Sequence, residues 1–393
     1  LQMLTADKIK INCRYSISQI TELNLEIKEG SHGKLLLKGY LKEAIEEGIL
    51  SDEIIEITGK NEDGREEIIF TGIIQELHVF HENGVYGITI SAATSDVLLD
   101  KQKKSRSFQE VPLPLQQILR KILSEYQGEV YCENSSATVG IPVVQYEETD
   151  WEFCKRLASW MGVGIYGDSQ GRHPKILTGV CDTGKAYFEG SSYQVCIDEE
   201  YYRLGRNRQG AAKSEFLYYQ VESTENYAIE SRAYYKGQKK YIFEKMAELQ
   251  NGVLIFRYKL GGRCRFLKSQ IKNRMIAGIA LAGEIRKTEK QDVYINLDID
   301  GGNGKAVHPY PWAPATGNMM YCMPKTGTRA YLYFPNCNEA EAVVINSIRT
   351  NGATGAGFAN VQQRVFATEH GKQMQLYDLS LIHISEPTRP LYI

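Results

Sequence analysis

The sequence lacks an apolar run long enough to cross a membrane. Its longest, around residues 275–283, is far shorter than the roughly 20 residues that a membrane-spanning helix requires. Residues 1–12 mix charged and apolar side chains, so they contain no continuous signal-peptide core. We therefore expect a chain without a signal peptide or a transmembrane helix, which is made and assembled in the cytoplasm.

The sequence also lacks a surplus of either charge. Its 46 Lys and Arg residues nearly balance its 48 Asp and Glu residues, and the formal net charge is -2. Nucleic acids and anionic membranes attract proteins that carry a broad positive field. We therefore predict no nucleic-acid partner.

Metal-binding and disulfide patterns are missing. The eight cysteines include no Cys-x-x-Cys pair and no regular spacing, which predicts reduced thiols in the core. His78 and His81 are three apart in a strand-like stretch, so they point to opposite faces. Residues 298–304 begin like a calcium loop, but Gly302 and Pro309 stand where ligands belong, which predicts a loop between strands. We predict no metal site.

Common enzyme motifs are missing as well, including Gly-x-Ser-x-Gly and His-Glu-x-x-His. Residues 179–186 resemble a phosphate-binding loop, but Ala186 replaces the hydroxyl that binds magnesium. A strand-like stretch at residues 187–190 follows instead of a helix, so we expect a hairpin turn. We predict no catalytic residue, no cofactor and no enzymatic activity. A glycosidase carboxylate pair is defined only in space, so a peptidoglycan hydrolase or effector remains the alternative.

Most of the sequence favours strands. In residues 8–97, apolar and β-branched runs alternate with turn residues, which predicts an antiparallel barrel or sandwich. The runs are residues 23–27, 34–37, 54–58, 68–74 and 86–92. Tyrosine-rich stretches in residues 175–271 predict a second barrel. Within it, residues 241–249 fit either a helix or an extended edge strand.

Residues 142–168 predict a strand, a capped helix and a second strand. Thr149 and Glu152 match a capping box, so the helix is expected to begin near Asp150. Gly162 can adopt the left-handed conformation that ends it. The apolar residues at helical spacing predict packing rather than a binding site; they are Trp151, Cys154, Leu157, Ala158 and Met161. An earlier helix is predicted from Pro114, with one apolar face made of Leu115, Ile118, Leu119 and Ile122.

From Ile279 onward, short strands separated by Gly, Asn and Pro clusters predict an OB-type barrel. The expected strands are Ile285 with its neighbours and residues 293–297, 319–323, 328–334 and 342–348. OB barrels often bind single-stranded nucleic acid, but residues 279–350 contain seven Lys or Arg and seven Asp or Glu, which gives no positive groove. The aromatic residues fit core or subunit contacts equally well; they are Tyr310, Trp312, Tyr321, Tyr331 and Tyr333.

Two separated motifs resemble one protein family. The run Gln-Tyr-x-Glu-x-Asp-Trp-Glu-Phe ends at Phe153 and is followed by Arg156 and Leu157. Tyr-Pro-Trp-Ala at residues 310–313, the Pro-x-x-Gly turn at 324–327 and the Val-rich strand at 343–348 form the second motif. Both are similar to the VgrG and phage-tail hub and spike proteins of contractile injection systems, and they occur in the expected order. The resemblance extends to about Tyr377.

This resemblance implies a non-enzymatic, structural role in a phage tail, a tailocin or a type VI secretion-like device. It implies a homotrimer in which two hub-type β-barrels per chain present six quasi-equivalent positions to a hexameric tube. The OB barrel would then narrow to a trimeric piercing spike. The implied partners are further copies of the chain, a tail tube protein, baseplate proteins and a spike-tip protein or effector, while the target membrane is met only by piercing.

We therefore predict a mainly β fold with a small α/β insertion. Residues 1–104 form the first hub β-barrel, 105–174 an α/β subdomain, 175–273 the second hub β-barrel and 274–350 the OB barrel. Residues 351–379 begin the spike. Residues 380–393 resemble translated sequencing-adapter text, which predicts a non-native tail; a natural short tail is the alternative.

Overall fold

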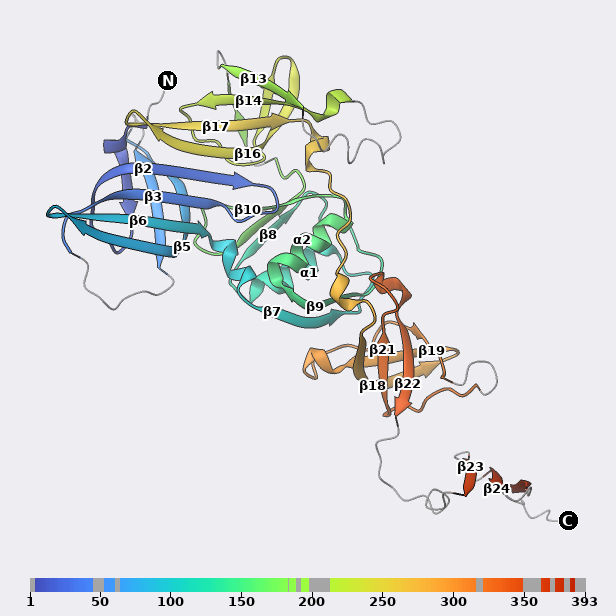
Figure 1. The fold of residues 1–393 in the computed structure, drawn as a ribbon. Coiled ribbons are helices and arrows are strands. Elements are labelled where there is room, and N and C mark those ends of the chain that lie inside the picture. Colours follow the sequence, from blue (N-terminus) through green and yellow to red (C-terminus); the bar gives the residue numbers. More distant parts are fainter. Residues whose placement is uncertain are drawn as a thin grey trace.

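The computed structural model describes residues 4–44, 53–60, 64–182, 184–188, 192–197, 213–315, 321–348, 362–367, 372–377 and 382–385. Two β-domains lie side by side at one end of the molecule, and an insertion with two labelled helices follows them (Figure 1). A small barrel lies beyond the insertion, and the C-terminus lies beyond that barrel (Figure 1). The predicted mainly β fold with a small α/β insertion is confirmed. In the described part of the chain, no helix has the length and apolar character needed to span a membrane.

The first β-domain is antiparallel and follows the predicted strand runs. Its strands are β1 (Ile9–Asn12), β2 (Ile17–Lys28), β3 (Lys34–Leu41), β4 (Ile54–Lys60), β5 (Glu66–Glu82) and β6 (Val85–Thr94). Their order is β1-β4-β5-β6-β3-β2. Alternate residues of β2 and β3 point inward, so that Leu23, Leu25, Leu35 and Leu37 are buried while their neighbours face outward. The alternation seen in the sequence therefore gives the core face of this domain.

The second β-domain resolves the ambiguous stretch at residues 241–249, which is extended. Its strands are β12 (Lys185–Ala186), β13 (Tyr193–Ile197), β14 (Leu217–Ser223), β15 (Arg232–Tyr235), β16 (Gln238–Gln250) and β17 (Val253–Gly261). β16 is not an edge strand, because it pairs with β17 on one side and with β2 on the other. Residues 240–243 are all buried, and alternation of buried and half-buried residues begins only at Phe243, which accounts for the ambiguous sequence pattern.

The two β-domains share one sheet of twelve described strands. β2 and β16 pair antiparallel, with Leu25 opposite Ala247. One hydrophobic core cluster contains side chains from both domains, including Leu23 and Leu25 from the first and Phe256 and Tyr258 from the second. The two predicted barrels are therefore joined edge to edge by backbone hydrogen bonds and a common core.

The insertion has its own core beneath two helices. Its elements are β7 (Lys103–Phe108), α1 (Leu115–Ser124), β8 (Glu129–Cys132), β9 (Val143–Thr149), α2 (Asp150–Trp160), β10 (Ile165–Gly167) and β11 (Lys175–Thr178). α1 begins directly after Pro114 and buries the four residues expected on its apolar face. α2 begins at Asp150 with both hydrogen bonds of the capping box present, and Gly162 has φ +74°. These local predictions are confirmed.

The OB barrel contains four of the five expected strands and corrects the fifth. It contains β18 (Ala280–Glu289), β19 (Asp292–Leu297), β20 (Tyr310–Pro311), β21 (Arg329–Tyr333) and β22 (Val343–Ile348), in the order β20-β19-β18-β21-β22. The strand expected at residues 319–323 is wrong where it can be examined: 316–320 lie outside the described residues, and 321–323 form no strand. Tyr310 and Pro311 pair with β19 instead, because this pairing buries the Tyr310 ring.

The C-terminal segment forms a small antiparallel sheet. Its strands are β23 (Gln363–Ala367), β24 (Gln373–Tyr377) and β25 (Ile382–Ser385), in that order. β25 comes from the segment that we interpreted as a non-native tail, and it pairs with β24. β23 and β24 lie beyond the OB barrel in Figure 1.

Candidate assembly site

Arg156 joins the insertion to the OB barrel through a buried polar cluster. The side chain projects from α2 and is 1% exposed. Its Nε and Nη2 donate to the two carboxylate oxygens of Glu148, each at 2.8 Å, and Nη2 also donates to the Val144 carbonyl at 2.8 Å. Its Nη1 donates to Glu339 Oε1 at 3.1 Å, and Glu339 belongs to a short turn of the OB barrel. One guanidinium therefore holds a helix, a strand and the neighbouring domain.

The Arg156 cluster consists of Arg156, Glu148 and Glu339. It contains two carboxylates and one guanidinium, so one carboxylate has no cation to neutralise it. Burial raises the pKa of Glu339 to about 7, although the Arg156 guanidinium lowers it. Burial also raises the pKa of Glu148. The guanidinium lies 5.1 Å from the Phe153 ring centroid and 5.3 Å from that of Trp160, so aromatic faces exclude water around it. A single shared proton makes this cluster neutral.

A second buried carboxylate, Asp150, organises the start of α2. It accepts hydrogen bonds from Lys104 Nζ and Tyr126 OH, each at 2.7 Å, and from Gln145 Nε2 at 3.0 Å. Arg106 also binds it. Burial alone would raise the pKa of Asp150, but these hydrogen bonds, led by Lys104, hold it below its usual value. Asp150 therefore stays ionised and fixes β7 and β9 to the helix.

The OB barrel is also clamped to β7. The Ser107 amide and hydroxyl donate to the two carboxylate oxygens of Asp300, at 2.6 and 2.7 Å. Gln109 Nε2 donates to the Ile295 carbonyl at 3.0 Å. Asp300 belongs to the stretch that began like a calcium loop; this stretch joins β19 to β20, as expected, and directs that carboxylate to Ser107. These contacts and the Arg156 cluster attach the barrel through two separate faces.

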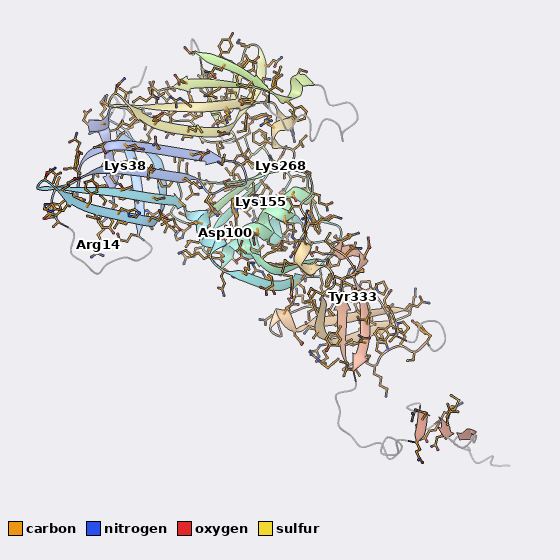
Figure 2. The ribbon with its side chains drawn as sticks, in the orientation of Figure 1. Arg14, Lys38, Asp100, Lys155, Lys268 and Tyr333 are labelled. Atoms are coloured by element: carbon orange, nitrogen blue, oxygen red, sulfur yellow. The ribbon has the colours of Figure 1, made fainter. Side chains whose placement is uncertain are left out.

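The insertion is tied to the first β-domain through His32. Its Nδ1 lies 2.5 Å from Asp96 Oδ2, its Nε2 lies 3.3 Å from Asp100 Oδ2, and its ring packs 4.5 Å from that of Trp151. Burial lowers the pKa of His32, but Asp96 and Asp100 outweigh it and leave the pKa raised. Lys155 Nζ adds a hydrogen bond to the Gly30 carbonyl at 2.8 Å. Figure 2 shows Asp100, which directly precedes the insertion, and Lys155, which belongs to it, between the β-domains and the barrel that carries Tyr333.

A comparison with protein families identifies the same architecture. The family model described as "Phage tail baseplate hub (GPD)" matches residues 22–219, which is half of the chain. The chain belongs to the phage tail baseplate hub family. The match covers β2 to β14, and so includes most of the first β-domain, the whole insertion and the start of the second β-domain.

Solved structures share the fold of this hub protein. One is the E. coli c3393 protein, a component of the type VI secretion system with structural similarity to T4 bacteriophage tail proteins gp27 and gp5. It matches with a TM-score of 0.60 and 13% identity, and the match covers 86% of this chain and 100% of the c3393 chain. A 43 kDa tail protein of prophage MuSo2 from Shewanella oneidensis matches with a TM-score of 0.52 and 12% identity, over 67% and 99% of the two chains. A chain of the Francisella PdpA-VgrG complex matches with a TM-score of 0.54 and 10% identity, over 98% and 88%. A sequence search among curated proteins found no match.

Two stretches that resembled binding motifs lack, in the described part of the chain, the features that those motifs need. Residues 179–186 do not form the hairpin turn that we expected, because β12 pairs with β15 in parallel and not with β11. In the part of the chain that the structure describes, no helix follows this loop, so the helix start that a phosphate loop needs is missing. His78 and His81 lie on the exposed part of β5, and the described residues contain no group of three His, Cys, Asp or Glu side chains suited to a metal.

The cysteines and aromatic residues divide between core and surface. All eight cysteines are free thiols, and only Cys322 is exposed. The prediction of reduced core thiols holds for the buried Cys154 and for three partly buried residues that pack against the core clusters, namely Cys13, Cys132 and Cys181. Trp151 is 4% exposed and packs in the insertion core, as expected. Among the OB aromatics, Tyr310 is buried and Tyr321 is exposed, while Trp312 Nε1 donates to the Cys322 carbonyl at 3.0 Å.

Sequence reasoning named Arg156 only as part of a family motif, and it did not single out Glu339 or Ser107. The partners of Arg156 and Ser107 lie 183 and 193 residues away in the chain. The local signal near Arg156 was its place three residues after Phe153 and four before Trp160, which sets a charge between two aromatic side chains on the helix surface. Such a placement indicates a buried ion pair only when the partner is known.

Proposed function

We propose that this protein is a non-enzymatic structural hub of a contractile injection apparatus, which joins a hexameric tube to a trimeric piercing spike. The apparatus is a phage tail, a tailocin or a type VI secretion-like device. The observation that carries this proposal is the shared sheet, in which β2 and β16 hold two β-domains edge to edge within one chain. The family match supports the baseplate location.

The shared sheet suits a threefold assembly that faces a sixfold tube. A homotrimer of this chain contains six β-domains, two from each copy, and can therefore face a sixfold tube with six similar surfaces. The fixed pairing of β2 with β16 sets the angle between the two domains of each copy. On this proposal the partners on that side are the tail tube protein and the surrounding baseplate proteins.

The end of the molecule that carries the OB barrel has the position expected for the base of a spike. The insertion separates the β-domains from the OB barrel, and β22, the last strand of that barrel, points away from the β-domains (Figure 1). We propose the division at residues 1–104, 105–174, 175–273, 274–350 and 351–379, with residues 380–393 as the non-native tail. The segment from 351 would lead toward a needle, a spike-tip protein or an effector. Assembly would take place in the cytoplasm, and the particle would reach a target membrane only by piercing it.

Light scattering after size exclusion tests the homotrimer. The chain has a mass of 44.5 kDa, and we expect a particle of three times that mass at micromolar concentration. A stable monomer under these conditions would contradict the proposed assembly.

Zymography on peptidoglycan tests the non-enzymatic role. We expect no clearing by the purified chain. Clearing that a single carboxylate substitution abolishes would show the hydrolase activity that the sequence leaves as an alternative.

A further inference from the structure

The second β-domain contains a lysine that the hub role does not use. Lys245 lies on β16, and its side chain is 1% exposed. Its Nζ lies 5.2 Å from the centroid of the Phe256 ring. Lysine is almost never fully buried without an ionic partner, so its contacts require an explanation.

The lysine meets an asparagine amide. Lys245 Nζ donates a hydrogen bond to Asn226 Oδ1, and Asn226 Nδ2 donates to the Ile68 carbonyl at 3.2 Å. The amide is therefore held at both ends, with its carbonyl turned to the lysine and its NH2 group turned away. The Asn226 carbonyl carbon is bonded to the oxygen that Nζ contacts, so the amine nitrogen lies close to that carbon.

The surroundings favour an uncharged amine. Burial lowers the pKa of Lys245 to about 8, and the nearby charges of Glu67 and Asp168 oppose this only in part. A substantial fraction of the side chain is therefore neutral near physiological pH, and a neutral amine has the lone pair that a nucleophile needs. Lys245 is buried and Asn226 is half-buried, which limits the access of water that would compete with the amine.

We propose that Lys245 and Asn226 form an intramolecular isopeptide bond once the chain has folded. The Nζ lone pair attacks Asn226 Cγ, and a bond forms between these two atoms. The bond from Cγ to Nδ2 then breaks, and the leaving nitrogen takes a proton from Nζ and departs as ammonia. The step is an exchange of one amide for another, so it requires no oxidant, reductant or second substrate.

The bond would fasten a loop to the centre of the shared sheet. Asn226 lies between β14 and β15, whereas Lys245 lies on the strand that also pairs with β2. The Ile68 carbonyl that holds the amide belongs to the first β-domain. A covalent link here would therefore brace the place where both domains meet, and it would exist whether or not the chain forms a trimer.

Intact mass spectrometry of the purified full chain tests the bond. We expect a mass about 17 Da below the sequence mass, because one ammonia is lost. A peptide map should contain one branched peptide that joins the segments around Asn226 and Lys245. A wild-type chain of full mass, with both residues in separate unmodified peptides, would overturn the proposal, and this result does not depend on any variant folding.

Two variants and a matched control locate the reaction. Lys245→Arg and Asn226→Ala should each restore the full sequence mass, whereas Lys259→Arg, on the neighbouring strand, should keep the loss. If Lys245→Arg keeps the loss of about 17 Da, the asparagine or another side chain has cyclised by itself, and the proposed bond is wrong.

Discussion

At the scale of single residues, the attachment of the OB barrel depends most on Arg156. Replacing it with Met would leave Glu148 and Glu339 buried opposite each other without a cation. We expect Arg156→Met to lower the free energy of unfolding by about 3–5 kcal/mol, measured by urea denaturation. Arg14→Met is the matched control, because Arg14 forms an exposed pair with Glu53 and should cost at most about 1 kcal/mol. Equal effects of the two substitutions would contradict the role of Arg156.

Glu339 gives the junction a pH dependence of definite sign. Its pKa is about 7 in the folded chain, above the ordinary 4.5. The folded chain therefore holds an extra proton between these two pH values, so its stability falls as the pH rises through that interval and is level above it. Relative to Glu339→Gln, which is neutral throughout, the wild type should lose roughly 2–3 kcal/mol across the interval.

Urea denaturation of both proteins at several pH values measures this difference. Glu230, whose pKa burial also raises to about 7, is present in both and cancels in the comparison. A constant difference between the two proteins from pH 4.5 to 7 would show that Glu339 keeps its ordinary pKa.

The residues of this junction also show the limit of sequence reasoning. Gln145, Glu148 and Asp150 were named as parts of a family motif. The structure shows that Gln145 binds the buried carboxylate of Asp150 and that Glu148 binds the buried guanidinium of Arg156. Glu339 carried no comparable signal. Its role arises because the OB barrel brings it to Arg156 from 183 residues away, and no local pattern encodes that distance.

At the scale of elements, the start of α2 is fixed by Thr149. Its hydroxyl accepts from the Glu152 amide at 3.1 Å, and the Glu152 carboxylate accepts from the Thr149 amide at 3.0 Å. Thr149→Ala should lower stability by about 1–2 kcal/mol in thermal or urea unfolding, because a helix amide loses its partner. Thr149→Ser keeps the hydroxyl and should recover most of the loss. If Thr149→Ala and Thr149→Ser lost the same stability, the methyl group of Thr149 and not its capping hydroxyl would account for the loss.

Elements with local signals were predicted well, and elements defined by distant partners were not. The cap and apolar face of α2 depend on residues within a few turns of one another, so the sequence showed where the helix begins. β16 was ambiguous because residues 240–243 are all buried and the alternation of buried and half-buried residues begins only at Phe243. β20 was missed because it has only two residues, which count as a strand only through their pairing with β19.

At the scale of the whole molecule, the shared sheet gives the chain its shape. The sequence predicted two barrels but not their connection, since β2 and β16 are separated by the entire insertion. Their pairing turns two domains into one body, while the buried contacts of Arg156 and Ser107 attach the OB barrel. The molecule therefore has a broad double β-domain at one end and a narrow barrel at the other (Figure 1).

Electron microscopy of the purified assembly tests the central claim most directly. We predict a ring with threefold symmetry in which six β-domains alternate around the axis, two from each chain, with three OB barrels gathered below it. Class averages that show single chains, or a ring in which the number of chains is not three, would contradict the account.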